Sequence, residues 1–158
     1  MIASGLLPER ALSDTLFSVS FPATLIHLDR DAIAGSMGYE HGAMPEHFRD
    51  LLHDAANRAL AISDVQAGYR LITPPVPPSG KGHHIRIDSA TGFDTGPRIT
   101  SLMKGASLLC CFALTIGPAI DNWIHELSSE EDYTGCYMAN AVASTIAEGA
   151  VELLHGHI

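Results

Sequence analysis

Basic residues are scarce in this sequence, and their scarcity limits which partners the protein can have. The 158 residues include 9 Lys and Arg against 18 Asp and Glu, which gives a net charge of −9 with neutral histidines. Lysine occurs only at Lys81 and Lys104. Because nucleic-acid binding needs a basic face that neutralises phosphates, we expect no nucleic-acid partner.

Long apolar segments and a disulfide framework are also lacking. The longest apolar run, residues 106–117, has about a dozen residues, whereas a membrane-spanning helix needs about 20. The first ten residues do not place a basic segment ahead of an apolar one, as a secretory signal does. Three cysteines, two of them adjacent at Cys110 and Cys111, are too few for a disulfide-stabilised fold. We therefore expect a cytoplasmic protein without membrane association, whose cysteines are buried thiols.

Motifs of a self-sufficient catalytic site are missing as well. The sequence contains no Gly-x-Ser-x-Gly elbow, no Gly-x-Gly-x-x-Gly phosphate turn and no Walker loop. These absences disfavour a hydrolase, a kinase or a dinucleotide-dependent enzyme. We assign no catalytic residue and expect ligand or partner binding rather than autonomous catalysis.

Histidine is abundant, with nine residues, but the spacing does not predict a metal site. His41, His47 and His53 are six residues apart, so on a helix each is turned about 240° from the one before. The adjacent pair at positions 83 and 84 falls on a predicted strand, where neighbours point to opposite faces. We interpret these residues as surface histidines and expect no bound metal.

The length and the hydrophobic content of 46% fit a single domain with a core. Alternating residues 15–21 predict a strand that residues 25–28 continue, and the apolar residues 107–115 predict a central strand buried on both faces. Other strands are expected at 69–73 and 84–88, joined as a ribbon, and helices at 29–37, 45–65, 98–104, 118–127 and 131–155. The mixed order predicts an α+β fold, with a mixed or antiparallel sheet packed against helices.

The last predicted helix, which we expect to be largely buried, carries the most distinctive polar residues. Glu148 and Glu152 are four residues apart, so one face of the helix carries both carboxylates. Either that face is exposed to solvent, or a carboxylate lines a ligand cleft. His155 and His157 follow at a C-terminal end that we expect to fray.

Three stretches together resemble the activation domain of cobalamin-dependent methionine synthase and its stand-alone relatives. Residues 28–39, with Met37-Gly38-Tyr39, resemble a segment near the start of the stand-alone relatives. Residues 107–121 resemble an apolar strand followed by Thr-x-Gly-Pro and a helix. Residues 146–155 are similar to the activation-domain helix Leu-Ala-Glu-Ala-Phe-Ala-Glu-Tyr-Leu-His. The similarity covers residues 24–158, and residues 1–23 form an N-terminal extension with a strand.

The resemblance implies a ligand and a partner. In that family the domain binds S-adenosylmethionine and presents its methyl group to inactive cob(II)alamin, which a neighbouring corrinoid domain or protein holds. The first glutamate of the family's helix contacts S-adenosylmethionine and corresponds to Glu148 here. The resemblance therefore implies that Glu148 faces the ligand and that cobalamin is bound by a partner.

The chain departs from the family pattern at its C-terminal side. It ends at Ile158, before the Arg-x-x-x-Gly-Tyr segment that supplies most S-adenosylmethionine contacts in the family. We expect a homodimer or a complementing chain to cover the surface this leaves. Two readings stay open: an accessory activation-domain-like module that helps reactivate a corrinoid cofactor, or an interaction module that has lost the S-adenosylmethionine site.

Overall fold

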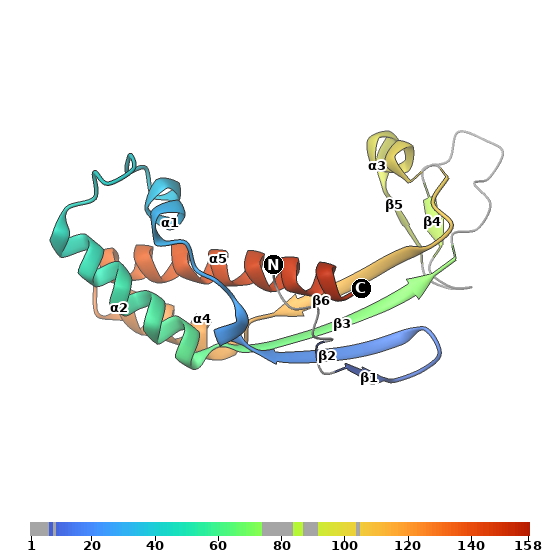
Figure 1. Ribbon diagram of the computed structural model, residues 1–158, viewed down its shortest axis with the longest axis horizontal. Coiled ribbons are helices and arrows are strands. Elements are labelled where there is room, and N and C mark those ends of the chain that lie inside the picture. Colours follow the sequence, from blue (N-terminus) through green and yellow to red (C-terminus); the bar gives the residue numbers. More distant parts are fainter. Residues whose placement is uncertain (1–6, 8, 74–83, 87–91, 104) are drawn as a thin grey trace. The chain divides into compact units, whose positions relative to one another are not determined.

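The computed structural model of the chain confirms the α+β class (Figure 1). It describes residue 7 and residues 9–73, 84–86, 92–103 and 105–158. The strands are β1 (Glu9–Ala11), β2 (Leu16–Pro22), β3 (Asp64–Ile72), β4 (His84–Arg86), β5 (Gly92–Asp94) and β6 (Leu109–Thr115). The helices are the 3-10 turn η1 (Ala23–Leu25), α1 (Arg30–Ser36), α2 (Glu46–Ile62), α3 (Gly96–Leu102), α4 (Pro118–Ser129) and α5 (Tyr133–His157).

The chain divides into two compact units. The first contains residues 1–10, 18–67 and 114–158, and the second contains residues 11–17 and 68–113. An antiparallel sheet has the strand order β1-β2-β3-β6, and all four of its strands contribute residues to both units. Among the described helices, none is both long enough and apolar enough to cross a bilayer.

The first unit has its core around α5, which packs against α1, α2 and α4. One face of α5 is buried and is built largely from small and branched side chains, among them Ala139, Val142, Ile146 and Ala150. The buried side of α2 consists of Leu52 and three alanines, Ala55, Ala56 and Ala59, so the two helices can pack closely. Burial is confined to one side, so the expectation that α5 is largely buried is wrong for its opposite face.

Local sequence signals set the ends of the helices in this unit. Asp29 caps α1, because its side chain accepts hydrogen bonds from the backbone N–H groups of Asp31 and Ala32, at 3.0 and 3.1 Å. Gly38 follows α1 with a φ of 93°, a conformation that glycine adopts without strain. The expected helix at 29–37 is thus confirmed, as are the strand at 15–21 and the helix that begins after Gly117.

Strand β6 differs from the prediction. The apolar run was expected to form a central strand buried on both faces, but β6 lies at the edge of the sheet formed by the described strands, and none of its residues is buried. Phe112 is 51% exposed, Cys110 is exposed and Cys111 is half-buried, so the expectation of buried thiols is also wrong. The apolar run correctly indicates a strand. The position of that strand in the sheet depends on which strands pair with it, and an apolar run does not specify its pairing partners.

Three smaller expectations also need correction. Residues 25–28 do not continue the strand, because the chain turns through η1 directly after Pro22. The helix expected to reach residue 65 ends at Ile62, and residues 64–65 begin β3. The segment 84–88 was expected to pair with 69–73, but β4 pairs antiparallel with β5, while β3 lies between β2 and β6.

The second unit contains the β4–β5 pair and α3, together with parts of the larger sheet. Within it, the rings of Phe17 and Tyr69 stack with centroids 4.9 Å apart. The backbone N–H of Leu71 donates to the carbonyl oxygen of Thr15 at 2.9 Å, which continues the pairing of their strands. The proline-rich loop expected at residues 74–80 lies outside the described residues.

Candidate functional site

The exposed face of α5 lines a groove that contains Glu148, the residue singled out from the sequence. The groove has a volume of about 370 Å³ and lies within the first unit. From α5 it receives Tyr137, Asn140, Ala141, Ser144, Thr145 and Glu148, and from the end of α1 it receives Ser36 and Met37. We call this the Glu148 groove. Its volume falls within the usual range of small-molecule sites.

Polar atoms that remain available in the Glu148 groove are mainly hydrogen-bond acceptors. The hydroxyl of Ser36 donates to the carbonyl oxygen of Ile33 at 2.7 Å, and that of Thr145 donates to Ala141 at 3.0 Å. The side-chain amide nitrogen of Asn140 donates to the carbonyl oxygen of Cys136 at 2.8 Å. The hydroxyl donors of Ser36 and Thr145 and one N–H of Asn140 are therefore occupied, whereas the hydroxyls of Tyr137 and Ser144 can still donate, and the hydroxyl and amide oxygens keep lone pairs.

Glu148 adds the only formal charge among the residues that line the groove. Its carboxylate is exposed, and among the described residues it makes no hydrogen bond or ion pair. No lysine, arginine or histidine contributes to the lining. An anionic surface rich in acceptors favours a ligand that brings positive charge and N–H or O–H donors.

The sequence beside Glu148 fixes the position of this part of α5. Gly149 lies against Ile26, and a Cβ atom at position 149 would come within 2.5 Å of the Cγ2 atom of Ile26. Ile26 itself is buried. Glycine therefore lets α5 approach the segment that follows η1, and this close approach holds Glu148 at the groove.

The two glutamates of the predicted pair have different surroundings. Both are exposed, as the solvent-facing reading of this helix face expects, and Glu148 but not Glu152 is among the residues that line the Glu148 groove. Reasoning from the sequence missed the polar residues that share the groove with Glu148. Tyr137, Asn140 and Ser144 precede Glu148 at spacings of eleven, eight and four residues, so helical periodicity was the signal that places them on its face.

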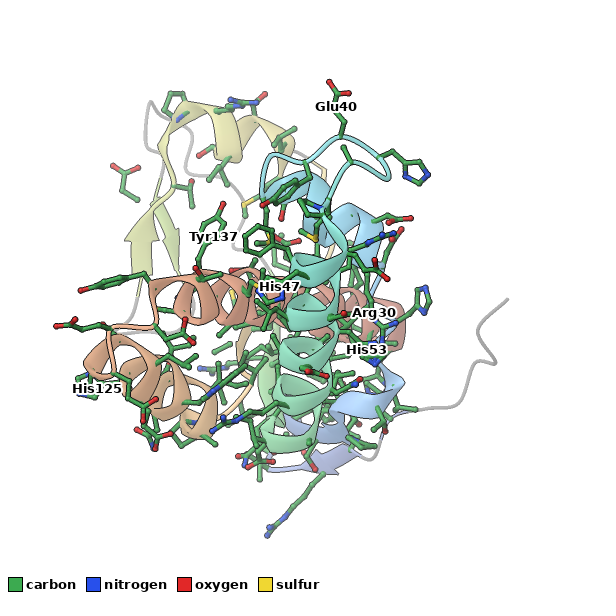
Figure 2. All side chains as sticks on the ribbon, turned by 90° about the vertical axis from the view of Figure 1, so that its left-hand side faces the viewer. Arg30, Glu40, His47, His53, His125 and Tyr137 are labelled. Carbon is green, nitrogen blue, oxygen red and sulfur yellow. The ribbon has the colours of Figure 1, made fainter. Side chains whose placement is uncertain are left out.

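The histidines do not converge. Figure 2 shows His47 and His53 on α2 and His125 on α4, lying apart from one another. His41, His47 and His53 are exposed, as expected. Within the described part of the chain, no group of three His, Cys, Asp or Glu side chains could hold a metal ion. His83 lies outside the described residues.

His157 has a structural role that the sequence did not indicate. The expectation of a frayed C-terminal end is wrong, because α5 continues to His157 and that side chain is only 4% exposed. Its Nε2 atom lies 2.9 Å from a carboxylate oxygen of Glu9, and its Nδ1 atom accepts from the backbone N–H of Leu7 at 3.2 Å. His157 thus ties the end of α5 to β1 and to Leu7.

The surroundings of Cys110 do not favour the reactive thiolate. Although the side chain of Cys110 is exposed, nearby protein atoms partly desolvate its thiol and raise the pKa above the ordinary value, and the neighbouring Cys111 adds to the increase. A raised pKa keeps the thiol protonated near neutral pH and lowers its nucleophilicity. Cys110 therefore differs from catalytic cysteines, whose pKa values are depressed.

Comparisons with known proteins add no assignment to this geometry. No model of a known protein family matches the chain, and no curated protein sequence matches it significantly.

Proposed function

We propose that this protein binds S-adenosylmethionine in the Glu148 groove and serves as an accessory, activation-domain-like module in cobalamin-dependent methyl transfer of the methionine synthase type. The observation that carries the proposal is the position of Glu148. The residue that corresponds to the ligand-contacting glutamate of the resembled family lines a groove of small-molecule size.

The chemistry of the groove supports this ligand. S-adenosylmethionine carries a positive sulfonium, a positive ammonium group and a negative carboxylate, which gives a net positive charge, together with N–H and O–H donors on its amino group and ribose. The Glu148 groove offers a carboxylate and several acceptor oxygens, and none of its lining residues is cationic. No cationic side chain of the lining would therefore repel the sulfonium or ammonium group as Glu148 attracts it.

In such a system the protein binds and positions, and the methyl donor and the cobalt of a corrinoid supply the chemistry. We propose that the corrinoid belongs to a partner domain or protein and not to this chain. The described residues contribute no catalytic acid, base or nucleophile to this proposal. Their function would be to hold the donor at an open groove that a partner can reach.

Calorimetric titration of S-adenosylmethionine into the full chain tests the proposal. We expect measurable binding to the wild-type protein and weaker binding to Glu148→Gln, which keeps the size of the side chain and removes its charge. Glu152→Gln is the matched control, because Glu152 is exposed on the same helix but does not line the groove. Absence of binding at millimolar ligand, or equal effects of the two substitutions, would contradict the proposal.

Strand β6 favours a second candidate function, that of an interaction module. This edge strand has seven residues, none of them charged or buried, and only one neighbour among the described strands. The opposite edge, β1, has three residues, two of which are Glu9 and Arg10. Short, charged edges resist pairing with another chain, whereas long, uncharged edges permit it.

The occupant we propose for β6 is a second copy of the chain, paired antiparallel about a two-fold axis. The strand brings no charge to such a pair, so the net charge of −9 is not concentrated at the contact. Sedimentation analysis should show a dimer that Ala113→Lys weakens, while Ala11→Lys on β1 leaves it unchanged. A wild-type monomer at tens of micromolar would rule out this candidate.

A further inference from the structure

Beside the Glu148 groove lies a second hollow that is lined with aromatic rings. Its volume is about 310 Å³, and it also lies within the first unit. The lining residues are Met37, Tyr39, Phe48, Tyr133, Thr134, Tyr137 and Met138. We call it the aromatic hollow. Three of the four tyrosines of the chain line it, so aromatic residues are concentrated here in a sequence with only 6% of them.

The rings come from three different segments. Tyr133 and Tyr137 stand one turn apart on α5, Phe48 belongs to the first turns of α2, and Tyr39 follows α1. Tyr39 and Phe48 contact each other, with ring centroids 6.5 Å apart. Figure 2 shows Tyr137 projecting from α5 on the side away from α4. The hollow is therefore bounded by rings on more than one side.

These rings are more exposed than core aromatics. Tyr133 is 70% exposed and Tyr137 is 55% exposed, whereas Tyr69 is 6% exposed. No lining residue of the aromatic hollow carries a charge. Exposed rings around an uncharged hollow offer flat apolar surface to a planar ring, which can stack on them and remove both surfaces from water.

The two sites are adjacent, because Met37 and Tyr137 line both of them. Along α5, Tyr137 and Glu148 are eleven residues apart, which corresponds to about 16 Å of helix. One end of this surface is aromatic and neutral, and the other is anionic and rich in acceptors. Such a surface matches an elongated ligand with a planar ring at one end and a positive charge at the other.

We infer that the aromatic hollow is a stacking subsite for a planar heteroaromatic ring of purine size, and that together with the Glu148 groove it holds the two ends of one ligand. This inference rests on the proposed function for its second half, since the charged end is assigned to Glu148. The first half, stacking in the hollow, stands on the tyrosines alone.

Three probes separate the two halves. Adenosine has the ring without the charge, S-methylmethionine has a sulfonium without the ring, and S-adenosylmethionine has both. Each is titrated by calorimetry into the full chain and into Tyr133→Ala, Tyr133→Phe, Tyr137→Ala and Glu148→Gln. Tyr133 is exposed, so its replacement should leave the fold intact, and circular dichroism of each variant checks this.

Because Tyr137 is the ring nearer to Glu148 along α5, Tyr137→Ala should weaken S-adenosylmethionine. We expect Tyr133→Ala to weaken adenosine about fivefold to a hundredfold, the range observed when a stacked aromatic residue is removed. S-methylmethionine should be unaffected by this change. Tyr133→Phe keeps the ring and should retain most of the affinity. Glu148→Gln should weaken both sulfonium ligands and leave adenosine unchanged.

Failure of the stacking subsite and failure of the proposed function of the Glu148 groove give different results. If adenosine fails to bind, or binds equally to wild type and Tyr133→Ala, the stacking subsite is wrong. If adenosine depends on Tyr133 while no sulfonium ligand depends on Glu148, the stacking subsite stands and the proposed function of the Glu148 groove is wrong. Weakening of S-methylmethionine by Tyr133→Ala would also overturn the assignment of separate ends.

Discussion

Replacing Gly149 with alanine tests how closely α5 approaches the residues that hold Glu148 in place. The new Cβ atom would meet the Cγ2 atom of Ile26 at 2.5 Å, well inside the ordinary contact range of 3.4–4 Å. Ile26 is 5% exposed and β-branched, so it has little freedom to move aside. Overpacking of this kind costs about 1–3 kcal/mol of folding free energy.

Alanine also has a higher helix propensity than glycine, by about 1 kcal/mol, and this gain partly offsets the clash. Gly156→Ala in the same helix supplies the control, because a Cβ atom there would meet nothing within 4 Å. Subtracting the free energies of unfolding of the two variants largely cancels the gain in helix propensity, because both replace glycine with alanine in α5. Gly149→Ala should therefore be about 1–3 kcal/mol less stable than Gly156→Ala.

Urea unfolding monitored by the fluorescence of Trp123 measures this difference. Trp123 is the only tryptophan, it is buried on α4, and it belongs to the same unit as Gly149. The two denaturation curves give the free energies of unfolding directly. If Gly149→Ala is as stable as Gly156→Ala or more stable, α5 does not approach Ile26 as described, and the argument that fixes Glu148 at the groove fails.

Two further predictions concern the backbone and the cysteines. Gly117→Ala should lower the free energy of unfolding, measured in urea, by about 1–3 kcal/mol. The reasons are that Gly117 has a φ of 91° and that a Cβ atom there would lie 3.1 Å from the Cβ of Asp64. Gly35→Ala is the control and should cause no such loss, because a Cβ atom there would meet nothing within 4 Å. The rate of alkylation at Cys110 should rise at a higher pH than that of free cysteine, because partial desolvation and Cys111 both raise its pKa. Cys111→Ser should lower the pH midpoint of this rise. A Gly117→Ala protein as stable as Gly35→Ala, or a Cys110 midpoint at or below that of free cysteine, would contradict these two expectations.

Local signals in the sequence predicted much of the secondary structure. Asp29 and Gly38 bound α1 as capping rules require, and the alternation at residues 15–21 identified β2. These features depend on a residue and its near neighbours. Strand β6 shows the limit, because its apolar run predicted a strand correctly but its place at the sheet edge follows from pairings with distant segments.

The candidate site was predictable only in part. Glu148 was identified from the sequence as a carboxylate on an otherwise apolar helix, and the structure places it at a groove. The contributions of Ser36, Met37 and Tyr39 could not be foreseen, because they depend on how the end of α1 meets α5. The contact between His157 and Glu9 joins residues 148 positions apart, and no local pattern encodes such a pairing.

The central claim is that Glu148 recognises positive charge on a ligand in its groove. The ratio of the affinities for S-adenosylmethionine and S-adenosylhomocysteine tests it most directly. S-adenosylhomocysteine lacks the methyl group and the sulfonium charge of S-adenosylmethionine but keeps the adenosyl and amino acid parts. Calorimetry should show that wild-type protein prefers S-adenosylmethionine by about two- to fivefold, as expected for an exposed charge pair. In Glu148→Gln this preference should fall to near one, and an unchanged ratio in that variant would contradict the claim.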